Sequence, residues 1–306
     1  MTIAPATTVG PVSLTVSSLD RALSFYGGVL GLSATRHPGG TAVLSGGAST
    51  PVVSLTEVAS AQPQPRRTTG LYHLAMLVPS RPALARALAR LVEARYPLHG
   101  ASDHLVSEAL YLADPDGNGI EIYADRPRDR WPRRDQTVQM ASDPLDLEGL
   151  LAELSGPGAG AGPPMDPATS IGHVHLRVSD LKQSEAFYHG VLGFDVSQRD
   201  YPGALFVAAG GYHHHIGMNT WGGAGAPPPP SESVGLRWFA INVPDGPELK
   251  AVLARVRMAN IDVRQTDAGW FLRDPSHNGI VLVSGGVMGI AKAASTVSVD
   301  TDRAAP

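Results

Sequence analysis

The chain has 306 residues, of which 43% are hydrophobic and 17% charged, so it can bury a sizeable core and wholesale disorder is excluded. Its net charge of -4 comes without a basic stripe, which excludes nucleic acid and anionic membranes as expected partners. No apolar stretch is long enough to span a bilayer, and residues 1–9 show no signal peptide, so we expect a cytoplasmic protein. Because cysteine is absent, any metal must bind to His, Asp or Glu.

An internal duplication organises the chain. Residues 13–32 and 175–194 align without a gap, and half of the paired positions are identical. The motif Asp-Pro-x-x-Asn-Gly-Ile occurs at 114–120 and again at 274–280. The sequence therefore predicts two similar halves, roughly 9–127 and 170–284.

Each half divides again into two βαβββ units, as hydrophobic patterning and turn residues indicate. In the unit 9–60 the expected elements are a strand at 12–17, a helix from Leu19 to Gly28, and strands near 32–37, 41–45 and 51–57. In the unit 70–127 they are a strand at 71–78, a helix at 81–95, and strands near 98–102, 107–112 and 119–124.

The second half repeats this order in the units 170–221 and 233–284, with a Gly/Pro-rich linker at 222–230. Residues 128–169 join the two halves and contain a short helix. The remaining expectations are an irregular surface segment at 131–134, that helix at 145–154, a flexible stretch at 155–164 and a flexible tail at 285–306.

The first strand of the third unit carries an unusual polar face. Alternate side chains of a strand share a face, so His173, His175 and Arg177 point one way and the aliphatic residues between them the other. Taken alone, such a face is more often exposed, or holds a satisfied core histidine. The rest of the chain favours a functional interpretation.

A chain of four βαβββ units with two particular motifs resembles the vicinal oxygen chelate superfamily. This superfamily includes glyoxalase I, extradiol catechol dioxygenases and bleomycin-resistance proteins. The two motifs are the helix ending Phe-Tyr-x-x-Val-Leu-Gly at 25–31 and the Asp-Pro-x-x-Asn-Gly-Ile hairpin. The resemblance covers nearly all of 9–284. It implies an α+β fold in which the four modules form two pseudo-symmetric cup-shaped sheets, one or both around a metal.

The resemblance also implies where metal ligands belong, on the first and last strands of each unit. These positions hold His73 and Glu121 in the second unit and His173 in the third. Unit four has Trp238 and Val281 there, and the first-strand position of unit one is Pro11. The expected metal site, His73, Glu121 and His173, therefore requires unit two to pair with unit three, while units one and four form a closed structural pair.

Further resemblance favours the extradiol dioxygenases. Tyr111 stands ten residues before Glu121, and His104 precedes it, as in the substrate pocket of those enzymes. His215 matches the position of their catalytic histidine outside the ligand set. We therefore expect Fe(II), with Mn(II) as a substitute, a catechol substrate and O2, with His215, His104 and Tyr111 as catalytic residues. The histidines that match no catalytic position are 37, 99, 175, 189, 214 and 277.

Two alternatives stay open at this point. A glyoxalase-type isomerase or lyase would use a redox-inert metal with His215 as a fourth ligand. A protein that binds an aromatic drug would need no metal, which leaves the three ligand-type residues unexplained. The ligand order also departs from the common extradiol enzymes, whose ligands come from units three and four. The sequence leaves a homo-oligomer open as well.

Overall fold

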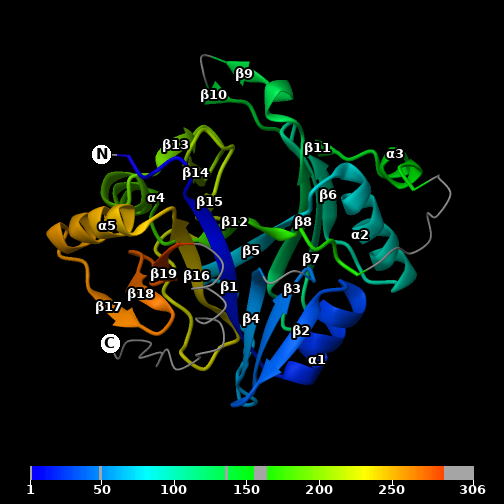
Figure 1. Ribbon diagram of the computed structural model, residues 1–306, viewed down its shortest axis with the longest axis horizontal. Coiled ribbons are helices and arrows are strands. Elements are labelled where there is room, and N and C mark those ends of the chain that lie inside the picture. The colour runs from blue at the N-terminus through cyan, green and yellow to red at the C-terminus, as the bar shows by residue number, and fades with distance from the viewer. Residues whose placement is uncertain (1, 48–49, 135–136, 155–163, 286–306) are drawn as a thin grey trace.

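The computed structural model describes residues 2–47, 50–134, 137–154 and 164–285 (Figure 1). These residues form two large mixed sheets with helices at the periphery, which confirms the predicted α+β class. Each sheet is built around an antiparallel pair of long strands, and each strand of that pair has a parallel neighbour on its other side. No described helix is both long and apolar enough to cross a membrane.

The first sheet combines strands from the beginning and the end of the chain. Its order is β17-β18-β19-β16-β1-β4-β3-β2, so units one and four meet at the β1–β16 pair. Its strands are β1 (Thr8–Val16), β2 (Ser33–His37), β3 (Thr41–Ser45), β4 (Pro51–Glu57), β16 (Gly235–Val243), β17 (Val263–Thr266), β18 (Gly269–Arg273) and β19 (Gly279–Ser284).

The second sheet combines strands from the middle of the chain, in the order β11-β6-β7-β8-β5-β12-β15-β14-β13. Units two and three meet at the β5–β12 pair, so the predicted pairing across the middle of the chain is confirmed. Its strands are β5 (Gly70–Leu77), β6 (Gly100–Asp103), β7 (Ser107–Ala113), β8 (Gly119–Asp125), β11 (Asp143–Pro144), β12 (Ser170–Arg177), β13 (Asp195–Gln198), β14 (Ala204–Ala208) and β15 (Ile216–Asn219).

The helices start at polar caps and turn their apolar side chains toward the sheets. Ser18 caps α1 (Leu19–Leu23), which continues as a π-helix to Val29, and Asp180 caps α4 (Leu181–Glu185), which continues as a π-helix to Val191. The Phe-Tyr pairs 25–26 and 187–188 lie buried in these π-helical turns. The two long helices are α2 (Arg81–Glu93) and α5 (Gly246–Met258), each with Pro in its first turn.

The repeated Asp-Pro-x-x-Asn-Gly-Ile motif has a structural role. The buried carboxylate of Asp114 accepts hydrogen bonds from the backbone N–H and the side chain of Asn118, and from the hydroxyl of Tyr26 at 3.0 Å. Asp274 accepts the same set from Asn278 and from Tyr188. The two recurrent motifs therefore bind each other, and in each half of the chain they tie a helix of one sheet to a hairpin of the other.

The segment between the halves differs from the prediction at Trp131. We expected an irregular surface segment at 131–134, but the indole of Trp131 is only 4% exposed, and its Nε1 donates to the carbonyl of Arg126 at 2.8 Å. It packs with Val106, Val138 and Tyr212, apolar partners that local sequence does not reveal. The short elements here are a 3-10 turn (Arg128–Arg130), β9 (Arg133–Arg134), β10 (Thr137–Val138) and α3 (Leu147–Ala152).

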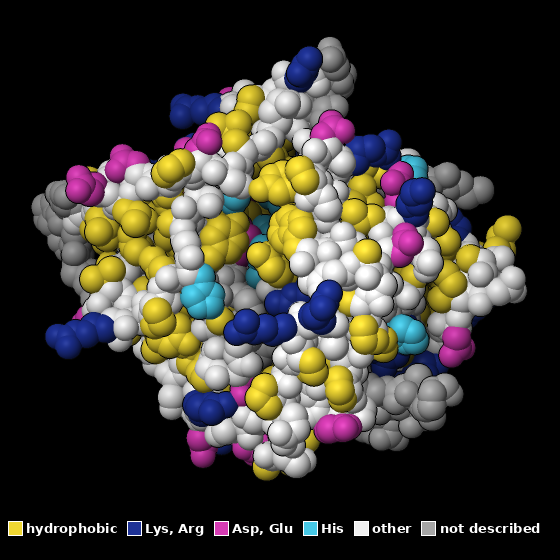
Figure 2. Space-filling model, turned by 180° about the vertical axis from the view of Figure 1, so that it is seen from behind, with side chains coloured by type: hydrophobic (Ala, Val, Ile, Leu, Met, Phe, Trp, Pro, Cys, Tyr) yellow, Lys and Arg dark blue, Asp and Glu magenta, His cyan; other side chains and the backbone are white. Residues whose placement is uncertain are grey.

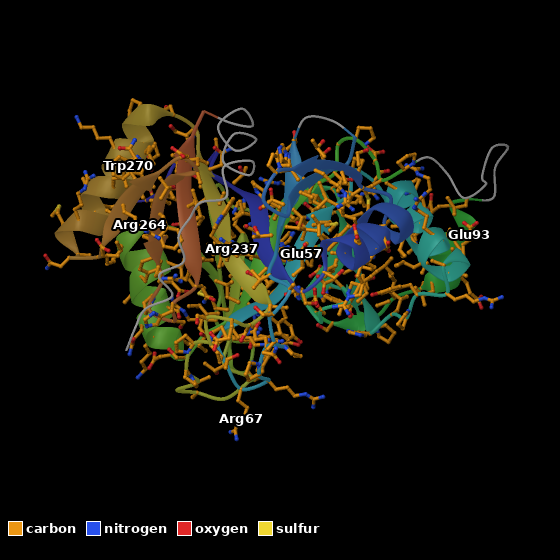
Figure 3. The ribbon with its side chains drawn as sticks, turned by 90° about the horizontal axis from the view of Figure 1, so that it is seen from below. Glu57, Arg67, Glu93, Arg237, Arg264 and Trp270 are labelled. Carbon is orange, nitrogen blue, oxygen red and sulfur yellow. The ribbon has the colours of Figure 1, made fainter. Side chains whose placement is uncertain are left out.

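The predicted flexible stretch and tail lie, except for Pro164 and Gly285, outside the described residues. Figure 3 shows the described chain from below, with Trp270 and Arg264 at the outer end of the first sheet and Arg237 near the middle of the molecule. The first sheet carries a cluster of buried hydrophobic side chains. They are Trp238, Ala240, Ala268, Phe271, Val281 and Val283.

Candidate active site

Three ligand-type side chains meet on three neighbouring strands of the second sheet. Glu121 lies on β8, His73 on β5 and His173 on β12, and these strands are adjacent in that order. One donor atom from each lies within 4.8 Å of the others. Oε2 of Glu121 is 3.1 Å from Nε2 of His73 and 3.1 Å from Nε2 of His173. All three residues are buried, so the chain brings together the set that its sequence predicts as metal ligands.

The donor set fits a divalent metal. Such an ion holds imidazole nitrogen and carboxylate oxygen at about 2.1 Å, so two ligands at right angles lie about 3 Å apart. The Glu121 to histidine distances match this separation. Within the described chain, Nε2 of His73 is buried without a hydrogen-bond partner, which a bound metal would provide. Two imidazoles with one carboxylate form the facial triad typical of non-haem Fe(II) sites.

The electrostatics of the triad also favour a cation. Burial alone would raise the pKa of Glu121, but the imidazoles of His173 and His73 outweigh it and hold that pKa well below its usual range. Burial lowers the pKa of His173 to about 4, against the opposing effect of Glu121. At neutral pH Glu121 is therefore an anion and His173 presents a neutral nitrogen lone pair, the protonation states that metal binding requires.

His104 and Tyr111 form a hydrogen-bonded pair beside the triad. Tyr111 on β7 lies opposite Glu121 in the β7–β8 register, and its hydroxyl is 2.6 Å from Nε2 of His104. Nδ1 of His104 lies 2.6 Å from the carbonyl of Ala141, which can only accept, so Nδ1 carries the proton and Nε2 accepts from Tyr111. Burial and the nearby Glu121 raise the pKa of Tyr111 well above its usual value. The phenol therefore stays protonated.

The structure places the three consecutive histidines in three different environments. β15 begins only at Ile216, so residues 213–215 lie before the strand and need not alternate between two faces. His214 lines the cavity, and its ring centre is 4.1 Å from that of His173. His215 is buried outside the cavity lining, where its Nδ1 accepts from the backbone N–H of Ala209 at 3.1 Å. Neither joins the three-residue ligand group.

A hydrogen-bond chain connects His214 to a carboxylate. Nδ1 of His214 lies 2.9 Å from Nδ1 of His213, and Nε2 of His213 lies 3.0 Å from Oδ1 of Asp125. The Asp125 carboxylate accepts from Nε2 of His213, and when this ring carries one proton its Nδ1 accepts from His214. This order leaves Nε2 of His214 with a lone pair. Burial and the neighbouring imidazoles lower the pKa of His214 well below its usual value.

These residues surround a cavity of about 540 Å³. Figure 2 shows this face of the molecule, with histidine side chains visible inside a hollow whose mouth is bordered by hydrophobic groups. Sequence reasoning left His99, His175 and His214 outside the site, yet all three line the cavity. For His175 the signal was available, because it shares a strand face with His173.

His175 lines the cavity and is fixed by a hydrogen bond to Asn219. Its Nε2 is 3.0 Å from Nδ2 of Asn219, an amide donor, so this nitrogen accepts and the ring is neutral. Burial lowers its pKa well below the usual value. A Cβ on Gly217 would lie 3.1 Å from the His175 ring, so a larger residue there would push the imidazole from its present position.

The fold and the donor set define a class of protein. The chain belongs to the glyoxalase/bleomycin resistance protein/dioxygenase superfamily, whose family model matches residues 8–122 and 170–282. The two matched segments correspond to the two halves of the duplication.

Comparison with individual proteins sharpens this assignment. The chain is 46% identical over 273 residues to the catechol-2,3-dioxygenase of Bacillus subtilis (strain 168), which covers 88% of this chain and 94% of the relative. Among solved structures, a provisionally assigned dioxygenase from Bacillus subtilis superposes with a TM-score of 0.61 at 13% identity, over 93% of this chain and 86% of that one. Glyoxalase I from Zea mays gives 0.54 at 16%, over 91% and 92%. These two structures support the fold.

Proposed function

We propose that this protein is an extradiol dioxygenase that cleaves a catechol next to its diol and incorporates both atoms of O2. The observation that carries the proposal is the buried triad of His73, Glu121 and His173, which faces a cavity that also holds His104 and Tyr111. The 46% identical relative from Bacillus subtilis, named catechol-2,3-dioxygenase, supports the same chemistry.

The metal that we propose is Fe(II), held by Nε2 of His73, Nε2 of His173 and the carboxylate of Glu121. When bound, it would supply a redox-active Lewis acid at which the diol oxygens and O2 meet. Two neutral ligands and one anion leave a net positive charge on a divalent ion, which favours an anionic diol. Mn(II) takes the same ligands and is the substitute to test.

Tyr111 and His104 would receive a proton from the substrate. The Tyr111 hydroxyl donates to Nε2 of His104, so its oxygen is left to accept a hydrogen bond from a diol hydroxyl in the cavity. As the substrate proton moves to the Tyr111 oxygen, the phenolic proton can move to Nε2 of His104. The Ala141 carbonyl, which already accepts from Nδ1, then stabilises the imidazolium.

We place the second acid–base role on His214 in preference to the predicted His215. The His214 ring faces the cavity beside His173, whereas His215 lies behind it with Nδ1 engaged by Ala209. The chain from Asp125 through His213 orients the imidazole so that its Nε2 lone pair is available to the cavity. At its Nε2, His214 would take up a proton and return it where O2 reacts with the substrate.

The isomerase alternative expects a fourth protein ligand. Among the described residues, the group of metal-ligating side chains within 4.8 Å contains three members, and His215 is not one of them. This composition favours the dioxygenase, because a diol and O2 both need open coordination positions.

The test is anaerobic loading of the protein with Fe(II), then addition of catechol and air. We expect a yellow ring-opened product and about one O2 consumed per catechol, activity lost in His73→Ala and kept in His37→Ala, a control on the first sheet. Absence of O2 uptake across several catechols, in protein shown to contain metal, would refute the dioxygenase proposal.

A further inference from the structure

Arg177 is the last residue of β12, the strand that also carries His173 and His175, and all three side chains line the cavity. Two residues of an extended strand span about 7 Å, so Arg177 begins about 7 Å beyond His175 and about 13 Å beyond the triad residue His173. The strand therefore runs from the metal ligands to a cation along one wall of the cavity.

The surroundings of Arg177 are aromatic. Its guanidinium carbon lies 5.6 Å from the centre of the Tyr72 ring, and that ring lies 5.3 Å from the ring of His73. One aromatic side chain thus separates the cation from a ligand of the triad. Tyr72, Tyr201 and Trp221 line this part of the cavity and are 37%, 39% and 46% exposed, so they present ring faces at its mouth.

Arg177 has no anionic partner within the described chain. Arg81 and Arg126, which are also partly exposed, each pair with carboxylates at 2.6–2.7 Å. For Arg177, by contrast, the described residues provide the contact with Tyr72 but no ion pair and no hydrogen bond. Its half-buried position lowers its pKa, since burial removes water from a charge that no protein anion compensates.

The cavity lining contains few charged side chains. Among the lining residues, Glu121 and Arg177 are the two with a permanent charge at neutral pH. Glu121 is directed at the two histidines of the triad. Arg177 is thus a half-buried cation at the wall of an open cavity, where an anion brought by a ligand would be less screened than in bulk water.

The cavity also has room beyond a single ring. Its volume of about 540 Å³ is in the range of sites that enclose drug-sized ligands, whereas a catechol has eight non-hydrogen atoms. With the diol at the triad, the ring and a short side chain can extend past Tyr72 toward the guanidinium.

We propose that Arg177 binds an anionic group of the substrate, so that the preferred substrates are catechols with a carboxylate on a short ring side chain. The inference rests on the proposed function, since it concerns the same cavity. A guanidinium matches a carboxylate through two parallel hydrogen bonds, and the aromatic mouth can stack on the substrate ring. In the first sheet the equivalent position in the gap-free repeat is Thr15, so this strand position carries a cation only in the cavity sheet.

The probes are 3,4-dihydroxyphenylacetate and its methyl ester, which share the diol and the side chain but differ in charge. Two quantities are compared: the ratio of kcat/KM for acid over ester by O2 uptake, and the ratio of their Kd values by calorimetry under argon. The variants are Arg177→Gln and, as a matched control, Arg67→Gln. Arg67 is exposed, lies outside the cavity lining and points away from the fold in Figure 3.

We expect the wild type and Arg67→Gln to prefer the acid, and Arg177→Gln to lose this preference by about 10- to 100-fold in both ratios, the range of a hydrogen bond to a charged group. Equal values for acid and ester in the wild type, or a preference that survives in Arg177→Gln, would overturn the inference. If the binding preference depends on Arg177 but no catechol consumes O2, the anion site stands and the dioxygenase proposal fails. If both probes are cleaved without preference, the dioxygenase proposal stands and the anion site fails.

Discussion

The two sheets of this protein share one architecture and differ in what fills them. In both, an antiparallel central pair is flanked by parallel neighbours. The first sheet places Trp238 and Val281 at positions where the second places His73 and Glu121, and the matching position for His173 is Pro11. The first sheet carries a buried hydrophobic cluster there, whereas the second sheet lines a cavity.

The two sheets of the duplicated scaffold therefore have different tasks. The first contributes packing that stabilises the fold, and the second holds the residues for chemistry. Trp238 and Phe271 exclude water from the first sheet, and burial of such rings stabilises the fold. The second sheet buries three ligand-type side chains, and burial of polar groups opposes folding unless they find partners. The predictions below exchange or remove residues at equivalent positions to test this division.

The largest effect should follow when Glu121 is replaced by the valine that stands at the equivalent position of the first sheet. Glu121→Val removes the only anionic ligand of the triad, so metal binding and O2 uptake should fall at least a thousandfold. Metal content and O2 consumption are measured on the same sample. Turnover within tenfold of the wild type would show that the carboxylate is not a ligand.

The reverse experiment removes Trp238 from the first sheet. The indole is 4% exposed, so Trp238→Ala should leave a cavity and lower the free energy of unfolding by about 3–5 kcal/mol, while metal content per folded chain is unchanged. Denaturant titration and metal analysis are the measurements. Its matched variant is His73→Ala. This change removes a ligand but little hydrophobic contact, so metal content should fall while the free energy of unfolding changes little. Loss of metal in folded Trp238→Ala would contradict the separation.

A smaller effect is expected within the cavity itself. Tyr111→Phe removes the hydroxyl that bonds to His104 but keeps the ring, so we expect kcat to fall about 100-fold with metal content unchanged. Steady-state O2 uptake with catechol measures it. A variant with wild-type kcat would remove Tyr111 from the proton path.

The smallest effect concerns His215, whose pKa burial lowers to about 3. Between about pH 6.5 and pH 3 the unfolded chain takes up a proton at this residue and the folded chain does not, so falling pH destabilises the protein by about 1.4 kcal/mol per pH unit from this group. His215→Gln keeps an acceptor for the Ala209 N–H and should flatten the slope by that amount. Unfolding midpoints at pH 7, 6 and 5 measure it, and an unchanged slope would refute the assignment.

Much of this fold could be predicted because the duplication and its motifs are local sequence patterns. The pairing of units two and three followed from the ligand positions, and the β5–β12 register confirms it. The triad was predictable because the resemblance places ligands on the first and last strands of a unit, where His73, Glu121 and His173 stand. The unit boundaries 9–60, 70–127, 170–221 and 233–284 stay predictions.

The remaining features depend on tertiary contacts. His214 reaches the cavity because β15 begins at Ile216, and a strand boundary is not fixed by three consecutive histidines. Trp131 is buried by Tyr212, which is distant in sequence. His99 lines the cavity from an exposed loop position that no periodic pattern marks.

The central claim is that all metal chemistry lies in the second sheet. It is tested most directly by anaerobic titration with Fe(II), with the bound equivalents counted per chain and the ligands examined by X-ray absorption. We predict one Fe(II) per chain, held by nitrogen and oxygen at about 2.1 Å, and none in Glu121→Val. Two equivalents per chain, or one that persists in Glu121→Val, would contradict the claim.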